Sequence, residues 1–175
     1  MEIRKIDAAH APDLNLKNDP FPLNGRVIPA LCDGKWTYRV ESWESDETQT
    51  FPEDQYDFEE LSRDGVAFGA YEDGVCVGLA VCRRGFFRYD YLENLKVSRA
   101  ARRKGVGKAL IRVCLDEAKA NGLLGIYLQA QDNNPGACLF YLHCGFEIGG
   151  FDNRVYEGTA QAGKADIFFY ARAWI

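Results

Sequence analysis

Apolar and polar residues alternate along several short stretches of the chain, and this period of two predicts half-buried β-strands. In Tyr89–Val97 the alternation places Tyr91, Glu93, Leu95 and Val97 on one face of the strand. Asp-Gly between two such stretches favours a tight hairpin. The other predicted strands are Met1–Ile6, Tyr38–Trp43, Val66–Tyr71, Val75–Arg83, Gly125–Gln131, Phe146–Tyr156 and Ala165–Ala171.

Two helices interrupt this strand pattern. Apolar residues three and four positions apart predict a helix over Lys104–Ala120, and Asn121-Gly122 ends it. Asn134 followed by Pro135 predicts the start of a second helix that runs to about Cys144. Antiparallel strands, then a strand–helix–strand–helix unit, then two more strands predict an α+β or mixed α/β fold.

Length and composition indicate an ordinary soluble globular protein. At 175 residues, with 47% apolar and 27% charged residues, the chain can bury a core of its own as a single domain over residues 1–175. Charges throughout the first residues argue against a signal peptide. Apolar runs stay well short of the ~20 residues of a membrane helix. We therefore expect a cytoplasmic protein without a membrane partner.

Charge is distributed unevenly. Glu41 to Asp64 holds ten acidic residues and one basic residue, 1 − 10 = −9, whereas Arg83 to Lys108 holds nine basic and two acidic residues, 9 − 2 = +7. Both stretches suit solvated faces, or a cation and a polyanion as ligands. Nucleic acid is a poor candidate because the net charge of −5 and the acidic block would repel it. A small phosphorylated ligand remains.

Cysteine and histidine do not indicate a disulfide framework or a metal site. The six cysteines lie apart in apolar runs without a C-x-x-C pair, which favours reduced core thiols in a cytosolic chain. The two histidines, His10 and His143, lack ligand spacing with a cysteine pair. We expect no metal.

A basic, glycine-rich segment follows the strand Tyr89–Val97 and begins the long helix. Glycines at Gly105 and Gly107 allow close backbone approach, and a helix N-terminus favours an anion. The spacing fits neither the G-x-x-x-x-G-K-[ST] loop nor the G-x-G-x-x-G fingerprint. The segment therefore predicts a pyrophosphate site formed by Arg102, Arg103, Lys104, Gly105, Val106, Gly107 and Lys108.

Together with a second pattern downstream, this segment resembles the GNAT superfamily of N-acetyltransferases. Arg102-x-x-Gly105-x-Gly107 is similar to the superfamily's motif A, and Asn134-x-x-Ala137-x-x-Phe140-Tyr141-x-x-x-Gly145-Phe146 to its next motif. Further segments resemble bacterial streptothricin acetyltransferases: Pro20-Phe21 through Ile28-Pro29, Trp36-Thr37, Arg88-Tyr89-x-Tyr91-Leu92-Glu93 and Gln131-Asp132-Asn133-Asn134. The resemblance implies a GNAT fold, a twisted, mostly antiparallel sheet of about seven strands with flanking helices.

The resemblance also implies acetyl-CoA as co-substrate and a role for each segment in binding it. The strand Tyr89–Val97 would splay from the next strand and offer its main chain at Leu95, Lys96 and Val97 to the pantetheine arm. The basic loop would hold the pyrophosphate. Asn134 and Ala137, on the second helix, would lie near the coenzyme sulfur.

Acetyl transfer to an amine needs three kinds of help: loss of the amine proton, stabilisation of the carbonyl oxygen and stabilisation of the leaving thiolate. The resemblance assigns the thiolate to Tyr141 as general acid and the carbonyl to a main-chain N–H of the Tyr89–Val97 strand. Glu93 is the candidate for the amine, either as base, directly or through water, or as an anchor of the cationic substrate.

The acceptor implied by the resemblance is a cationic small molecule, with the β-lysine amine of streptothricin as the expected target. The acidic block and the aromatics beside it suit an electronegative, aromatic-lined mouth, or else a solvated loop and helix. The candidate substrate residues are Trp36, Tyr38, Trp43, Tyr91 and Glu93.

Two alternative functions and one question of oligomeric state stay open at this stage. The first is an acetyltransferase of protein N-termini or of polyamines, since the coenzyme motif does not distinguish acceptors. The second, from a different class, is a non-catalytic module that senses acetyl-CoA. A homodimer formed through the last strands is the third open question.

Overall fold

A computed structural model describes residues 1–173 of the chain, and these form two compact units. The first unit comprises residues 1–19, 50–127 and 172–173, and the second comprises residues 20–49 and 128–171. Strand β9 (Gly125–Gln131) begins in the first unit and ends in the second.

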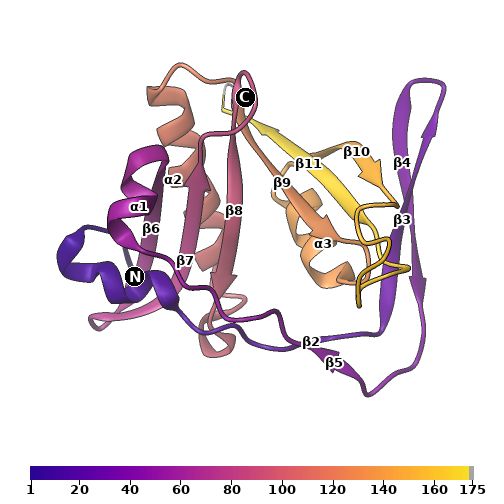
Figure 1. Ribbon diagram of the computed structural model, residues 1–175, viewed down its shortest axis with the longest axis horizontal. Coiled ribbons are helices and arrows are strands. Elements are labelled where there is room, and N and C mark those ends of the chain that lie inside the picture. Colours follow the sequence, from indigo (N-terminus) through magenta and orange to yellow (C-terminus); the bar gives the residue numbers. More distant parts are fainter. Residues whose placement is uncertain (174–175) are drawn as a thin grey trace. The chain divides into compact units, whose positions relative to one another are not determined.

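The first unit is a layer of antiparallel strands with helices on both faces, and Figure 1 shows β6, β7 and β8 side by side within it. Strand β1 pairs with β6, β6 with β7, and β7 with β8, all antiparallel. The elements are β1 (Glu2–Lys5), the 3-10 helix η1 (Ala8–Asn15), α1 (Phe58–Asp64), β6 (Gly65–Glu72), β7 (Val75–Arg83), β8 (Tyr89–Val97), the 3-10 helix η2 (Arg99–Ala101) and α2 (Val106–Ala120).

Strand β7 separates two parts of the core. On one face, Leu79 and Val81 pack in a buried cluster with Leu14 of η1 and Leu61 of α1. On the other face α2 lies so close to Gly78 that a Cβ there would sit 2.9 Å from Val106 Cγ1. Burial of each large apolar side chain contributes about 1.5–3 kcal/mol, so the helices on both faces are held by apolar packing.

The second unit contains two short sheets and the end of β9. Strands β3 (Gly25–Cys32) and β4 (Lys35–Ser42) form a hairpin, and β2 (Phe21–Pro22) pairs with β5 (Thr48–Gln49). Helix α3 (Pro135–His143) follows β9, and β10 (Glu147–Asp152) pairs antiparallel with β11 (Asp166–Arg172). Buried side chains of this unit include Val27, Leu128, Cys138, Ile148 and Phe169.

Within residues 1–173 the main sheet has seven strands in the order β1-β6-β7-β8-β9-β11-β10, and only the β8–β9 pair is parallel among the pairings described. This is the mixed, mostly antiparallel sheet with flanking helices that the sequence predicted. The predicted bounds of β7, β8 and β9 are confirmed. The predicted strand Tyr38–Trp43 overlaps β4, whereas β2, β3, β5 and α1 were not among the predicted elements.

Candidate functional site

Strand β8 carries five of the predicted site residues, and its two edges differ. Along one edge it pairs with β7 from Tyr91 to Val97. Along the other edge the ladder to β9 covers Tyr89 to Tyr91 and then ends. The main chain of β8 after Tyr91 is therefore available along that edge, as the expected splay requires.

A β-bulge in β8 corrects the predicted faces of this strand. Cys82 of β7 pairs with Leu92 and Val81 with Asn94, so Glu93 is an extra residue between two successive pairs. Arg83 pairs with Tyr91 and Ala80 with Leu95, and residues three apart on β7 face opposite sides. Tyr91 and Leu95 therefore lie on opposite faces. The prediction that Tyr91, Glu93, Leu95 and Val97 share one face was wrong, because it assumed an unbroken period of two.

The carboxylate of Glu93 is held in an ion pair. Arg83 donates from Nε to Glu93 Oε2 at 2.5 Å and from an Nη atom to Asp64 Oδ1 at 2.6 Å. Burial alone would lower the pKa of Arg83, but the hydrogen bond and charge of Glu93, with the charge of Asp64, raise it overall. The Glu93 side chain keeps 30% of its surface exposed. It is thus oriented by a fixed cation and remains within reach of a ligand.

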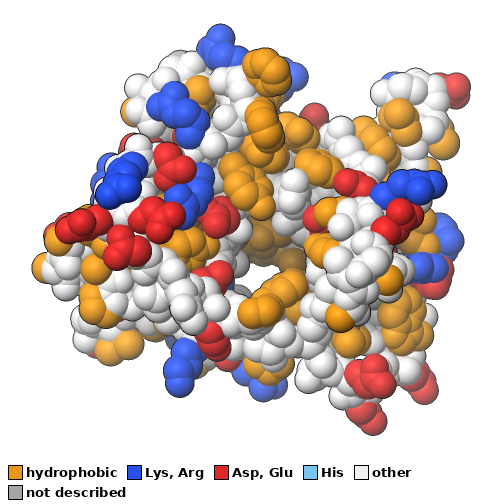
Figure 2. All heavy atoms as spheres, viewed as in Figure 1, with side chains coloured by type: hydrophobic (Ala, Val, Ile, Leu, Met, Phe, Trp, Pro, Cys, Tyr) orange, Lys and Arg blue, Asp and Glu red, His pale blue; other side chains and the backbone are white. Residues whose placement is uncertain are grey.

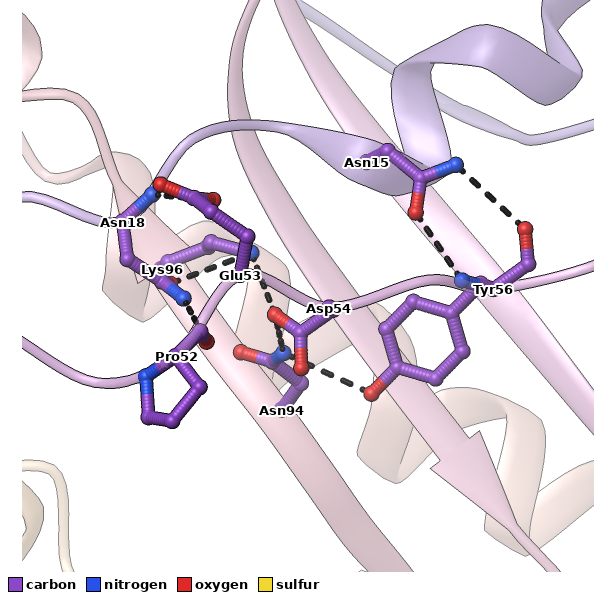
Figure 3. A network of polar contacts seen from close by, with 8 residues as sticks. All are labelled: Asn15, Asn18, Pro52, Glu53, Asp54, Tyr56, Asn94 and Lys96. Carbon is purple, nitrogen blue, oxygen red and sulfur yellow. Dashed lines mark hydrogen bonds and ion pairs between the residues drawn. The ribbon is translucent and has the colours of Figure 1, made fainter.

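A second polar network lies on the residues just after the bulge, and Figure 3 shows it. Asn94 Nδ2 donates to Asp54 Oδ2 at 2.8 Å, and Lys96 Nζ donates to the same oxygen at 2.6 Å. Asn94 also donates to the Tyr56 hydroxyl at 3.4 Å. Burial raises the pKa of Tyr56 to about 12, and the nearby charges of Glu93 and Asp54 act in the same direction. This hydroxyl therefore stays protonated at neutral pH.

Sequence reasoning missed the role of Asp54, which stood as one of ten acidic residues in the block. Its partner Lys96 was predicted to act through its main chain. In the structure the Lys96 side chain forms an ion pair with Asp54, and only 11% of the lysine side chain is exposed. A lysine inside the strand pattern of β8 was the one signal in the sequence. A buried lysine needs an acidic partner.

The predicted anion loop has the backbone geometry of a ligand cradle. Arg103 and Gly105 both have positive φ, 62° and 83°. Gly105 is the N-cap of α2 and has no side chain with which to cap it. The first bond of this helix runs from Ala109 N–H to Gly105 C=O, so the N–H groups of residues 106–108 precede the hydrogen-bonded ladder. Such a helix end, in a helix of 15 residues, fits a phosphate group.

The cations around this loop fall into two classes. Arg102 donates from Nε to the Val97 carbonyl at 3.0 Å and lies 3.5 Å from Asp19, which ties the loop to the end of β8. Lys104 lies 3.5 Å from Glu72. Arg103 and Lys108 are exposed. The first two cations therefore shape the loop, and the last two are the ones placed to attract an anion.

In the second unit, Asn134 is the N-cap of α3. Its Oδ1 accepts the Ala137 N–H at 3.1 Å, and Pro135 occupies the first turn, as the sequence predicted. The cap uses the side-chain oxygen, so the NH2 group is the part of Asn134 that can reach a ligand. Tyr141 is partly buried, with its ring 5.5 Å from Phe146 and 5.8 Å from Phe169, centroid to centroid.

The aromatic substrate candidates do not form one cluster. Trp36 and Tyr38 lie on β4, where Tyr38 is 47% exposed. Trp43 follows β4 and donates from Nε1 to the Leu23 carbonyl at 2.8 Å. Tyr91, in the first unit, contacts the Tyr127 ring at 5.1 Å. The structure thus places Tyr91 and Glu93 near each other on β8, whereas Trp36 and Trp43 lie at opposite ends of β4 in the second unit.

Several residues of the acidic block are used within the fold. Asp57 caps α1 by accepting the Glu60 N–H, and Glu41 lies 3.3 Å from both Arg26 and Arg39. Asp54 and Asp64 are the ion-pair partners already described. Figure 2 shows acidic and basic side chains mixed where α1 lies in Figure 1. For these residues the interpretation as a solvated or structural face is favoured over a substrate mouth.

None of the six cysteines forms a disulfide, as predicted, and Cys82, Cys114 and Cys138 are buried. The prediction of core positions was wrong for Cys32, which is exposed. Among residues 1–173 no group of His, Cys, Asp and Glu side chains is arranged to hold a metal ion. Within the same residues, no helix has the length and apolar character needed to cross a bilayer.

Comparison with known proteins shows the family of the chain. Residues 28–146 match the model of the acetyltransferase (GNAT) family. The chain belongs to this family. It is an acetyl-CoA-dependent acetyltransferase, as the two sequence motifs predicted, and a helix end flanked by exposed cations fits the coenzyme's phosphates.

The GNAT chain is similar to known acetyltransferases over nearly its whole length. The chain is 34% identical over 169 residues to streptothricin acetyltransferase A of Bacillus subtilis (strain 168), and the match covers 96% of this chain and 98% of that relative. A solved structure from Bacillus anthracis str. Ames, assigned as a streptothricin acetyltransferase and in complex with acetyl coenzyme A, superposes with a TM-score of 0.87 at 29% identity over 98% of this chain and 97% of that one. Nourseothricin acetyltransferase has the same fold, with a TM-score of 0.81 at 24% identity and 98% of each chain covered.

Proposed function

We propose that this acetyltransferase N-acetylates a primary amine of a cationic small molecule, and that the β-lysine amine of streptothricin is its substrate. The observation that carries the proposal is the similarity to the Bacillus subtilis relative over 96% of the chain. That similarity reaches well beyond residues 28–146, which match the general family model. The physiological role would then be antibiotic resistance, carried out by a small cytoplasmic enzyme.

The chain's own residues divide into groups that would bind the coenzyme. The N–H groups of Val106, Gly107 and Lys108, with the side chains of Arg103 and Lys108, would hold the pyrophosphate. Main-chain groups of Leu95, Lys96 and Val97 would hold the pantetheine arm along the edge of β8 that β9 does not cover. The Asn134 NH2 group, next to Ala137, would reach the coenzyme from α3.

Bound acetyl-CoA supplies the acetyl group as a thioester, and the protein must handle two protons. Glu93 would take the proton from the acceptor ammonium or hold that ammonium in place. Its ion pair with Arg83 orients the carboxylate and leaves 30% of the side chain exposed for this contact. Tyr141 would return a proton to the leaving thiolate. Its ring is fixed by the Phe146 and Phe169 rings, which limits the positions of its hydroxyl.

Aromatic side chains support a cationic acceptor. Tyr91 lies beside Tyr127 on the face of β8 that also carries the Arg83–Glu93 pair. In the second unit, Trp36, Tyr38 and Trp43 keep exposed or partly exposed rings. Faces of such rings attract ammonium and guanidinium groups.

Thiol release from acetyl-CoA tests the substrate directly, with streptothricin run beside spermidine, free lysine and a peptide with a free N-terminus. The proposal predicts that streptothricin alone is turned over rapidly, with a KM far below those of the other amines. Turnover of spermidine or of the peptide without turnover of streptothricin would keep the family and discard this substrate.

Matched variants test the two proton-handling residues. Glu93→Gln should lower kcat if the carboxylate is the base, and should raise only the acceptor KM if it is an anchor. Glu117→Gln is its control, because Glu117 is also ion-paired and is also 30% exposed.

Tyr141→Phe should lower kcat with little change in either KM. Tyr156→Phe, which removes a hydrogen bond to Asp166, is the control for loss of a tyrosine hydroxyl.

A further inference from the structure

The polar network on β8 lies beside a buried apolar cluster. Asn94 pairs with Val81 and Lys96 with Leu79, so all four side chains face the same side of the sheet. Leu79 and Val81 belong to a buried apolar cluster. A lysine and an asparagine beside this cluster are costly unless each polar group is paired.

One carboxylate pairs with both of them. Asp54 Oδ2 accepts from Asn94 at 2.8 Å and from Lys96 at 2.6 Å, and Lys96 also donates to Asn18 Oδ1 at 3.1 Å. The side chains of Lys96 and Asp54 are 11% and 28% exposed. Loss of one partner would leave a nearly buried charge uncompensated, which is among the largest effects that a single substitution can have.

Asp54 is itself fixed by a strap, which we define as residues 15–19 together with 50–57. Asn15 exchanges two hydrogen bonds with the main chain of Tyr56, at 3.3 and 2.9 Å. Asn18 donates to the Pro52 carbonyl at 2.8 Å (Figure 3). Two asparagines therefore bind the halves of the strap to each other and hold Asp54 over the strand.

The contacts of the strap lie directly beside the bulge. Asp54 binds residues one and three positions after Glu93, whereas Arg83 holds the Glu93 carboxylate itself. A bulged residue has no partner of its own in the ladder, so its direction depends on what fixes the strand around it. We propose that Asp54, acting through Asn94 and Lys96, is a positioning residue that sets the bulge and thereby the direction of the Glu93 carboxylate.

This inference rests on the proposed action of Glu93 on the acceptor amine, and a double-mutant cycle tests it. Asp54→Asn should lower kcat about tenfold if Glu93 is the base, or raise the acceptor KM about tenfold if Glu93 is an anchor, because a small displacement of a catalytic or binding group has a large effect. In the Glu93→Gln background the same substitution should change that constant by less than about twofold, because no carboxylate remains to be positioned. The KM for acetyl-CoA should change little in either background.

Two further variants separate positioning from simple destabilisation. Lys96→Gln keeps a donor for Asp54 and leaves without a counter-ion only the Asp54 carboxylate, which is the more exposed partner at 28% and still accepts from Asn94, so it remains informative if Asp54→Asn does not fold. We expect the same dependence on Glu93 with a smaller effect. Tyr71→Phe removes a hydrogen bond of 2.7 Å to Asp13 in the same unit. It should lower Tm and leave kcat unchanged in both backgrounds.

The possible failures are distinguishable. Equal losses of kcat, or equal rises in the acceptor KM, from Asp54→Asn and Lys96→Gln with and without Glu93 would overturn the inference and leave Glu93 in its proposed role. If Glu93→Gln changed neither kcat nor the acceptor KM, the role of Glu93 would fall, and the inference with it. Strong dependence on Glu93, together with an unaffected Tyr71→Phe variant, would establish Asp54 as a positioning residue.

Discussion

The two helices that follow strands of the sheet, α2 and α3, begin in opposite ways. Helix α3 begins at Asn134, whose side chain caps the Ala137 N–H, with Pro135 in its first turn. Helix α2 begins at Gly105, which has no side chain, adopts a left-handed backbone and is followed by three N–H groups outside the helical ladder. One helix end is satisfied by its own sequence, and the other is left for a ligand.

This difference shows how a binding site can be recognised from what a helix lacks. Glycine at the N-cap is less stabilising than a capping side chain by about a few tenths of a kcal/mol, so the glycine start of this 15-residue helix is a small cost to the fold. Binding of an anion at that end compensates the cost only in the complex. We propose the pyrophosphate of acetyl-CoA as this anion, and the contrast can be tested at each helix.

The largest effect is expected at Gly105, where the conformation itself makes the cradle. Gly105→Ala places a Cβ in open space but at a φ of 83°, which costs about 1–2 kcal/mol. If binding requires that conformation, calorimetric titration should show acetyl-CoA affinity reduced about tenfold. Gly74→Ala is a closely matched control, since Gly74 has a φ of 80° and equally open space in the β6–β7 turn. An equal loss of affinity in both variants would contradict a local role for Gly105.

An intermediate effect is expected at Asn134, where cap and ligand contact can be separated. Asn134→Ala should lower the free energy of unfolding by about 1 kcal/mol, because the Ala137 N–H loses its acceptor. Asn134→Ser keeps a capping oxygen and removes the NH2 group, so it should retain most of that stability. A raised KM for acetyl-CoA in Asn134→Ser, with unfolding in urea nearly unchanged, would assign the NH2 group to the coenzyme. An unchanged KM would leave Asn134 with its cap alone.

The smallest effect is expected from the exposed cation on α2. Lys108→Gln removes one exposed cation beside the proposed pyrophosphate site, and an exposed ion pair contributes about 0.2–1 kcal/mol, so acetyl-CoA affinity should fall about 1.5- to fivefold at low salt. The difference from wild type should shrink as salt rises, because the lysine is exposed. Lys119→Gln, at the other end of the same helix, should lack this salt-dependent difference.

Elements with a strong local signal could be predicted from the sequence alone. The bounds of β7, β8 and β9 agree with the predicted strands because each is an apolar or alternating run between turn residues. The Asp73-Gly74 turn has the left-handed angles that Asp-Gly predicts. Asp33-Gly34 carries the same signal and the same geometry, and it could have revealed the β3–β4 hairpin. Pro29, inside β3, obscured that strand because proline is rare within sheets.

The features that were missed depend on distant partners. Alternation through Glu93 fits a regular strand as well as a bulged one, and only pairing with β7 shows the extra residue. The bond between Lys96 and Asp54 joins residues 42 positions apart. Neither residue reveals in its local sequence that the other is its partner. Local pattern therefore predicted the glycine-rich start of α2, whereas the supports of Glu93 required the fold.

The register of β8 has a consequence for how such a chain can change by insertion and deletion. If Glu93 were removed, Asn94 would still pair with Val81 and Leu92 with Cys82, now as consecutive steps of an unbroken ladder. The sheet therefore does not need the residue at all. A single-codon insertion into a regular strand would create this bulge and present a carboxylate in one event, and a single-codon deletion would erase both while leaving every other pair in place.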